Sequence, residues 1–541
     1  MGRKRRRAIV HEADRHSEKQ PRTFSTASWS EVDDADSKPS PEVTHITQVD
    51  DLILWFDGAC GSVRSGSCLA IGLGAWQVPL WETLLPGAQA ASCVAGMVPS
   101  SPLVPKYPYS TESESNCVIL VAMNRGMLLA VDAATGSIAG HARGLARPAL
   151  DATSNDVAQQ QAPQPMLAAL SAVVGGSGTP LPQRGLAVVG GSDGSLRLAW
   201  TQATAATDES SSAPRVDIAS IPICCALVDM GAPVTCVAAA ATTARGDGGS
   251  TQLVSVTGSA HGTVQATSCI LDTTALQSTY EQACISSGLT SAPLAVLPAR
   301  ITAVVCLIPS LEPLGASMPA AAALPTALPA ALGSTSLWCA TDRAGHVAVF
   351  ATLCHDSAGG RAPSVILLAR SCVTPMPSPG GEAAQAGGPR EEEGGAAQAG
   401  GPSEEQDGST SSSRTDGLLA CVSGPIATAV VRAMGARGAC ELRWEQRFFV
   451  AGTAGTVMSL VAHLRVGLSP TGSPATAVSS ISAEIEVRRE TQVASDWVVA
   501  LSPGFEGSVW TGSLCGQGAP QLWKPLADPH STTTADASAS S

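Results

Sequence analysis

A short pattern recurs along this chain: an apolar strand, a polar corner that ends in glycine, and a second strand. In its clearest copy, Leu186–Val189 is an apolar run and Gly190–Gly194 is made of turn-forming residues. In Ser195–Trp200, which follows, leucine and tryptophan alternate with smaller or polar residues. Alternation places successive side chains on opposite faces of a strand, and glycine supplies the positive φ of a tight corner. The pattern therefore predicts a β-hairpin.

The hairpin pattern repeats across most of the chain. Five further copies are Val118–Asp132, Leu253–Ser268, Leu337–Phe350, Phe448–Leu460 and Val498–Thr511. We interpret a seventh copy as split, with Phe24–Trp29 as its first strand and Leu52–Phe56 as its second. The predicted corner glycines, which we treat as structural site residues, are Gly126, Gly194, Gly262, Gly345, Gly455 and Gly507.

Other short apolar segments surround these hairpins and suggest two more strands per repeat. Val234–Val237, Ile301–Val304 and Ile426–Val430 precede hairpins, and Ser364–Ala369 follows one. Four strands in each of seven repeats predict an all-β chain, a seven-bladed β-propeller spanning residues 8–527. A β-sandwich with glycine-rich hairpins is the alternative, but a sandwich has no reason to repeat its hairpin.

The first and last repeats should meet, because an open propeller exposes strand edges. We therefore expect both chain ends to contribute to the terminal blade, with Trp29 and Trp510 close together.

Three segments lack the periodicity of the blades. Residues 1–7 form a basic tail whose cluster Arg3, Lys4, Arg5, Arg6 and Arg7 has the composition of a nuclear-import signal, or of a solvated terminus. Pro375–Asp416 is an acidic insert rich in Gly, Pro and Glu, and residues 528–541 are rich in Ser, Thr and Ala. Neither can bury an apolar face, so both are predicted to be disordered, the first as an insert within the propeller.

Composition argues against several classes of partner. The net charge of −13 argues against direct binding to nucleic acid. The 16 cysteines are scattered without a CxxC pair, which favours reduced thiols and no metal. No apolar run is long enough for membrane insertion, and the sequence suggests no cofactor.

Two segments carry superficial signs of catalysis. Gly190–Gly194 contains the spacing Gly-x-Ser-x-Gly and looks like a phosphate loop, but a strand follows it where a helix is needed. Gly126–Gly136 resembles blades of quinone-cofactor dehydrogenases, although an aspartate-capped turn explains it better. We predict no catalytic residues and no enzyme. The alternative is a cofactor-binding or quinoprotein-like propeller enzyme that uses the central channel.

The segments Phe24–Trp29, Leu52–Trp55 and Gly190–Trp200 are similar to WD repeats, in which an apolar strand leads through Asp-Gly to an alternating strand ending in Trp. The resemblance implies a protein–protein interaction scaffold with other protein subunits as partners. Thr23–Trp29 followed by Leu52–Trp55 also resembles the start of the small WD-repeat nucleoporins. That resemblance implies a subunit of the Y-shaped scaffold of the nuclear pore complex, in the nucleus or nuclear envelope. The alternative is a WD-repeat adaptor of a cytoplasmic complex.

Overall fold

The computed structural model divides the chain into two compact units, Met1–Pro39 and Ser40–Ser541. All residues that it describes belong to the second unit, and the structural statements below concern these residues alone. They are 42–73, 79–86, 97–99, 118–123, 126–142, 167–175, 186–191, 195–203, 216–225, 234–243, 250–272, 289–311, 335–354, 362–373, 417–424, 429–434, 439–468, 478–514 and 519–525.

The described strands form consecutive groups, and the strands that pair within a group are antiparallel. The first strands of the third and fourth groups also pair with each other in parallel, so these two groups form one nine-stranded sheet. The first group holds β1 (Val43–Val49), β2 (Leu52–Asp57), β3 (Ser62–Ser67) and β4 (Trp81–Leu84), with the helix α1 (Cys68–Gly72) after β3. The second holds β5 (Met97–Pro99), β6 (Val118–Met123), β7 (Met127–Asp132) and β8 (Ile138–Ala142). The third holds β9 (Leu167–Gly175), β10 (Leu186–Gly191), β11 (Ser195–Ala203) and β12 (Val216–Cys225).

The remaining groups follow the same order, with variations at their outer strands. The fourth holds β13 (Val234–Thr243), β14 (Ser250–Ser259), β15 (Thr263–Asp272), β16 (Leu289–Thr290) and β17 (Leu294–Ala295). The fifth holds β18 (Ile301–Ile308), β19 (Thr335–Asp342), β20 (His346–Leu353) and β21 (Ser364–Cys372). The sixth holds β22 (Leu418–Ser423), β23 (Ala429–Met434), β24 (Ala439–Gly452), β25 (Thr456–Leu468) and β26 (Val478–Gln492). The seventh holds β27 (Val498–Pro503), β28 (Val509–Ser513) and β29 (Gln521–Trp523), with the short 3₁₀ helix η6 (Phe505–Gly507) between β27 and β28.

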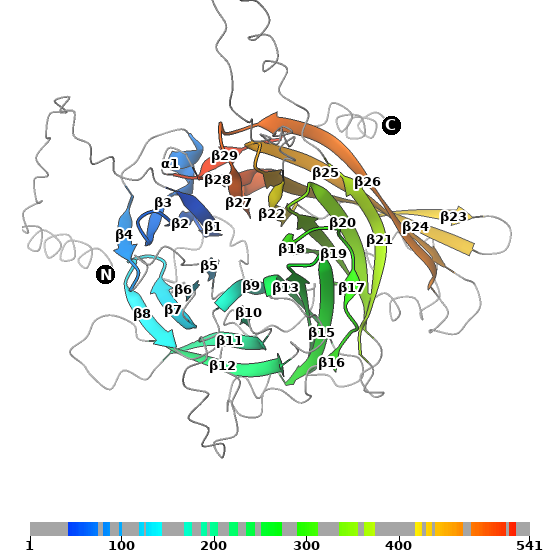
Figure 1. Cartoon of the computed structure of the whole chain (residues 1–541), viewed down its shortest axis with the longest axis horizontal. Coiled ribbons are helices and arrows are strands. Elements are labelled where there is room, and N and C mark those ends of the chain that lie inside the picture. Colours follow the sequence, from blue (N-terminus) through cyan, green and yellow to red (C-terminus); the bar gives the residue numbers. More distant parts are fainter. Residues whose placement is uncertain are drawn as a thin grey trace, which may run out of the picture. The chain divides into compact units, whose positions relative to one another are not determined.

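The groups are arranged around a common centre, with the first strand of each group innermost (Figure 1). These innermost strands contact one another in the cyclic order β1, β5, β9, β13, β18, β22, β27 and back to β1. A ring of radially arranged antiparallel sheets defines a β-propeller. The predicted all-β propeller is therefore confirmed. The number of seven blades stays a prediction, with which the seven described groups agree.

Buried apolar clusters lie at the junctions between neighbouring groups and hold the ring together. Strand β6 illustrates how one strand serves two junctions: Ile119 and Val121 pack toward the first group, and Val118 and Leu120 pack toward the third. Alternate side chains point to opposite faces of a strand, so a sheet buried on both faces needs a continuous apolar run. This requirement explains the uninterrupted sequence of β6, which a sandwich with one solvated face would not need.

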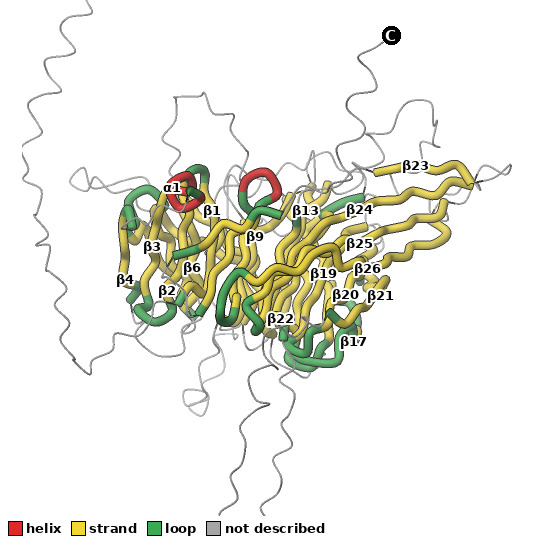
Figure 2. The backbone as a smooth tube through the Cα atoms, turned by 90° about the horizontal axis from the view of Figure 1, so that it is seen from above, coloured by secondary structure: helices red, strands yellow, loops and turns green. Residues whose placement is uncertain are grey.

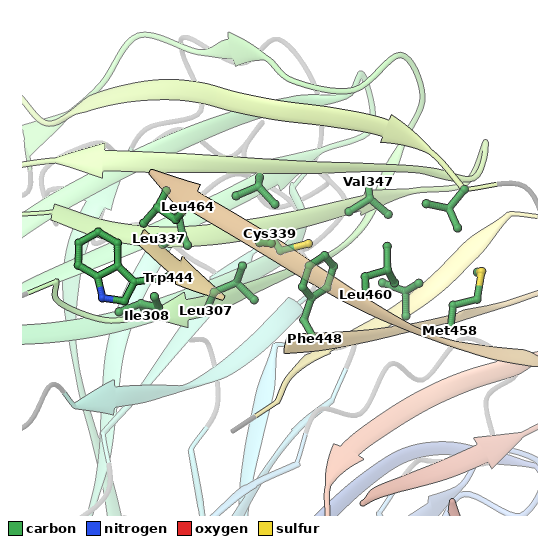
Figure 3. Packing of buried hydrophobic residues seen from close by; sticks show 14 of the residues in the cluster. Leu307, Ile308, Leu337, Cys339, Val347, Trp444, Phe448, Met458, Leu460 and Leu464 are labelled. Atoms are coloured by element: carbon green, nitrogen blue, oxygen red, sulfur yellow. The ribbon is translucent and has the colours of Figure 1, made fainter. Parts of the chain in front are cut away.

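The junction between the fifth and sixth groups has the largest cluster, in which Trp444, Phe448 and Leu460 meet Leu337 and Cys339 (Figure 3). Strands β24, β25 and β26 are unusually long, at 14, 13 and 15 residues. Their outer ends, with β23, extend past the neighbouring strands (Figure 2). The additional length lets β25 and β26 cover the outer part of the fifth group.

The interpretation of the first repeat was wrong. Leu52–Phe56 lies in β2 and pairs with β1 on one side and β3 on the other, so it is the first strand of the repeated hairpin. The second strand is β3, and Gly61, at φ 65°, ends the corner between them. The sequence SVRSGS of β3 contains a single large apolar residue, so its alternation is hard to detect. Phe24–Trp29 lies outside the described residues.

The strand expected at Ile426–Val430, before the hairpin of the sixth group, is not the innermost strand of that group. The innermost strand is β22, whereas β23, which contains part of Ile426–Val430, pairs with the outward half of β24. Val234–Val237 and Ile301–Val304 do lie in the innermost strands β13 and β18.

The ring closes by side-chain packing, and the described residues show no strand shared by the two chain ends. The indole Nε1 of Trp510 donates a hydrogen bond to the Gln48 side chain at 2.9 Å. Trp510 is fully buried against Val43, Ile53 and Trp55 of the first group. Trp29 lies outside the described residues.

Candidate functional site

Five of the six predicted corner glycines have positive φ: Gly126 at 74°, Gly262 at 76°, Gly345 at 84°, Gly455 at 73° and Gly507 at 76°. The sixth, Gly194, lies outside the described residues. Residues with a Cβ rarely adopt this conformation, so the geometry accounts for glycine at these positions.

Several corner glycines also accept hydrogen bonds from the segment that connects their group to the next one. The carbonyl oxygen of Gly262 accepts hydrogen bonds from the backbone N–H groups of Val296 and Leu297, at 3.0 and 3.1 Å. The carbonyl oxygens of Gly61, Gly345 and Gly455 likewise accept from residues that follow the outermost strand of their own group. The recurring glycine therefore has a second role that the sequence pattern did not indicate.

Both sides of the segment 374–416, which contains the predicted disordered insert and lies outside the described residues, are next to the corner at Gly345. On one side, the N–H of Val373 donates to the carbonyl oxygen of Gly345 at 2.8 Å. On the other, Gly417 lies so close to the carbonyl of Arg343 that a Cβ could not be accommodated, while its own backbone hydrogen bonds go to Thr453 of the sixth group. Asp342 stabilises the same corner by accepting from the N–H groups of Ala344 and His346, at 3.0 and 2.8 Å. The two sides of the segment therefore lie close together at this corner.

A central pocket of about 350 Å³ lies among the innermost strands, and residues from β1, β9, β13, β18, β22 and β27 line it. Its polar side chains include Thr235 and Thr302, which occupy equivalent positions in β13 and β18. The Thr235 hydroxyl donates to the carbonyl oxygen of Ile301 at 2.6 Å, and that of Thr302 to Leu418 at 2.8 Å. Each bond links an innermost strand to the next, so these hydroxyl groups hold the ring together.

His45 is the titratable imidazole of this pocket. Its ring nitrogen Nδ1 lies 3.2 Å from the Thr44 hydroxyl oxygen. Burial disfavours the charged form and lowers the pKa of His45 to about 4, so the ring is neutral at pH 7. The described lining contains no Asp, Glu, Lys or Arg. The polar convergence that a cofactor-binding or catalytic channel requires is not found among these lining residues.

The turn that resembles quinone-cofactor dehydrogenases has a structural explanation. The carboxylate oxygen Oδ1 of Asp132 accepts from the N–H groups of Ala134 and Thr135, at 3.0 and 2.7 Å. It also accepts from the Thr135 hydroxyl at 2.8 Å, and Gly136 ends the turn at φ 73°. The expected aspartate-capped turn is confirmed. Gly190 and Gly191 belong to β10, and β11 begins at Ser195, so a strand follows this glycine-rich segment.

An exposed apolar surface lies where the first and seventh groups meet. Leu69 and Leu73 are four residues apart in and just after α1, and their exposed fractions are 71% and 77%. Phe505 in η6 is 40% exposed. Leu522 of β29 lies between these elements, because Cβ atoms on Gly72 and Gly504 would come within 3.3 and 3.1 Å of its methyl groups. We call Leu69, Leu73, Phe505 and Leu522 the α1–η6 surface.

The sequence analysis missed the α1–η6 surface, although a signal was present. Ser67 is the N-cap of α1, and its hydroxyl accepts from the N–H of Ala70 at 3.5 Å. A capping serine followed by two leucines at helical spacing indicates a short helix with one apolar face. Buried Cys68 and half-buried Ile71 anchor the opposite face next to Trp510.

The possible import signal Arg3, Lys4, Arg5, Arg6 and Arg7 lies outside the described residues. Within the described ranges, no group of three or more His, Cys, Asp or Glu side chains is placed to hold a metal ion. No helix in those ranges is both long enough and apolar enough to cross a membrane.

No protein-family model and no curated protein sequence matches this chain. Among solved structures, it is similar to BBS1N in complex with ARL6DN, at 10% identity and a TM-score of 0.40, over 92% of this chain and 96% of that chain. It is also similar to Raptor from Chaetomium thermophilum, at 9% identity and a TM-score of 0.39, over 90% of this chain but 28% of that chain. The assignment to the β-propeller class rests on the strand pairing and the cyclic contacts described above.

Proposed function

We propose that this protein is a non-catalytic platform that binds other proteins, and that the α1–η6 surface is one of its binding sites. The observation that carries the proposal is the exposure of Leu69 and Leu73 at α1 and of Phe505 in η6, with Leu522 between the two elements. Soluble proteins rarely leave neighbouring large apolar side chains exposed unless a partner covers them. The pocket lining contains no Asp, Glu, Lys or Arg, and the hydroxyl groups of Thr235 and Thr302 join neighbouring strands. These two observations favour a binding site on the exterior of the ring.

The double substitution Leu69→Asp and Leu73→Asp is expected to lower partner recovery at least tenfold in a quantitative affinity purification. Burying a leucine side chain contributes roughly 1.5–3 kcal/mol, and each 1.4 kcal/mol is a factor of ten in affinity. Both side chains face solvent, so the melting temperature should stay within a few degrees of the wild type.

The matched control is Ile138→Asp with Ile366→Asp, which adds the same charge at two exposed apolar positions on other sheets, β8 and β21. This control should retain the partners. If the two double variants and the wild type recover the same proteins in equal amounts, the α1–η6 surface is not a binding site.

The narrower proposal is that the platform belongs to a nuclear or nuclear-envelope assembly. It is supported by the basic cluster Arg3–Arg7 and by the resemblance of Thr23–Trp29 and Leu52–Trp55 to small WD-repeat nucleoporins. Of these segments, only Leu52–Trp55 lies within the described residues, in β2.

Replacing Arg3, Lys4, Arg5, Arg6 and Arg7 by alanine is expected to move a tagged protein from the nucleus to the cytoplasm, because import receptors recognise the positive charge of such clusters. Fluorescence microscopy of the wild type and the variant provides the measurement. An unchanged nuclear signal would mean that the cluster is not the import signal, and a cytoplasmic wild type would overturn the nuclear assignment itself.

A further inference from the structure

Two cysteines from neighbouring sheets meet at the junction between the fifth and sixth groups. Cys339 lies on β19 and Cys421 on the innermost strand β22, and their Sγ atoms are 3.9 Å apart. The Cys421 thiol is directed at the Cys339 sulfur, while the Cys339 thiol is directed at the carbonyl oxygen of Ala340. Strands β19 and β22 are in contact, so the two backbones are already close.

The two thiols differ in their access to small molecules. Cys421 is half-buried and lines the central pocket, whereas Cys339 is completely buried in the apolar cluster at the junction. Its burial, together with the adjacent Cys421, raises the pKa of Cys339 well above its usual value. A small oxidant that enters the pocket therefore meets Cys421 first, with a protected second thiol directly behind it.

We propose that Cys421 and Cys339 form an oxidative modification site, at which a hydroperoxide converts the thiol pair into a disulfide joining the fifth and sixth groups. In the first step the Cys421 sulfur, having lost its proton to solvent, attacks one oxygen of the peroxide. The O–O bond breaks, and Cys421 becomes a sulfenic acid while hydroxide leaves and takes up a proton as water. The Cys339 sulfur then attacks the sulfenic sulfur, its proton leaves with the hydroxyl group as a second water, and the S–S bond forms. Two thiols are oxidised, and one peroxide is reduced to two waters.

The geometry requires only a small rearrangement. A disulfide has an S–S length of about 2.05 Å, so the sulfur atoms must approach each other by about 2 Å through side-chain rotation. The bond would close a loop spanning 82 positions, within which the segment 374–416 lies. It would covalently join two sheets that are held together by the largest apolar cluster.

The position of segment 374–416 between the two cysteines permits a direct test in the full chain. A specific protease site is inserted between residues 375 and 416, and the protein is treated with hydrogen peroxide, blocked with an alkylating reagent and cleaved. On a non-reducing denaturing gel the two fragments should migrate as one band, and adding a reductant should separate them. The linked fraction is expected to be at least ten times larger than in the variant Cys421→Ala.

Cys236→Ala is the matched control, because Cys236 lines the same pocket on β13 but belongs to a different junction. This variant should link like the wild type, and peptide mapping of the linked band should identify the Cys339–Cys421 bond with a loss of two hydrogens. Fragments of the peroxide-treated wild type that separate without reductant would overturn the proposal. Linkage that persists in Cys421→Ala would do so too. Because the wild-type result does not depend on a variant's folding, the test remains decisive if Cys421→Ala is unstable.

Discussion

Replacing Gly262 by alanine is expected to destabilise the protein by about 3 kcal/mol. The residue has a φ of 76°, where a Cβ costs about 1–2 kcal/mol. The new Cβ would also overlap the carbonyl oxygen of Leu297 and come within 2.8 Å of that of Ala299, so the connection would have to move away. That movement would weaken the two hydrogen bonds that the Gly262 carbonyl accepts, each contributing about 1 kcal/mol.

The comparison for this substitution is Gly190→Ala in β10. A Cβ at Gly190 would meet its nearest neighbour, Val234, at an ordinary 3.4 Å, and its φ is not positive. Denaturant unfolding of the two variants should therefore show a large decrease in stability for Gly262→Ala and less than about 1 kcal/mol for Gly190→Ala. Equal unfolding midpoints for the two variants would show that the corner at Gly262 does not stabilise the connecting segment.

Trp510→Ala is expected to have the largest effect, a loss of about 3–5 kcal/mol, because it removes a fully buried aromatic side chain from the cluster that closes the ring. Among the described residues of the seventh group, Trp510 alone belongs to the fully buried part of this cluster. The cavity would therefore weaken the packing between the first group and the last.

Trp510→Phe separates packing from hydrogen bonding. Phenylalanine retains much of the apolar contact but cannot donate to Gln48, so a smaller loss of about 1–3 kcal/mol is expected from the unpaired amide and the reduced volume. Denaturant unfolding should rank the wild type above Trp510→Phe, and Trp510→Phe above Trp510→Ala. A Trp510→Ala variant as stable as the wild type would mean that closure does not depend on this contact.

The repeated hairpins could be predicted because their information is local. An apolar run, a glycine corner and an alternating strand lie within about fifteen residues of sequence, and both faces of these sheets are buried. Strand β3 has little apolar character, so it was not recognised as a strand. As a result, β2 was assigned to the second position of the hairpin, although it is the first. The same reasoning explains β22, where the short sequence LLACVS was passed over for the apolar segment that follows it.

The candidate sites combine residues that are far apart in the sequence, and so they were harder to predict than the hairpins. In the α1–η6 surface, Leu522 lies next to both Gly72 and Gly504, which belong to the first and the last group and are near the same side chain only because the ring closes. Cys339 and Cys421 are 82 positions apart, and neither has a local pattern that suggests a partner. The hydrogen bonds accepted by the corner carbonyls could not be predicted either. Every residue has a backbone carbonyl oxygen, so the amino-acid sequence does not show which ones accept such bonds.

The corner at Gly345 has a consequence for how the chain can change in length. Val373 is hydrogen-bonded to this corner and Gly417 lies against the neighbouring Arg343, so the polypeptide that joins them starts and finishes near the same point of the ring. Each doubling of such a loop costs only about 0.6 kcal/mol in closure entropy. Duplication or loss of sequence repeats can therefore accumulate at this position without disturbing the blades, and an engineer could splice a whole reporter domain into it.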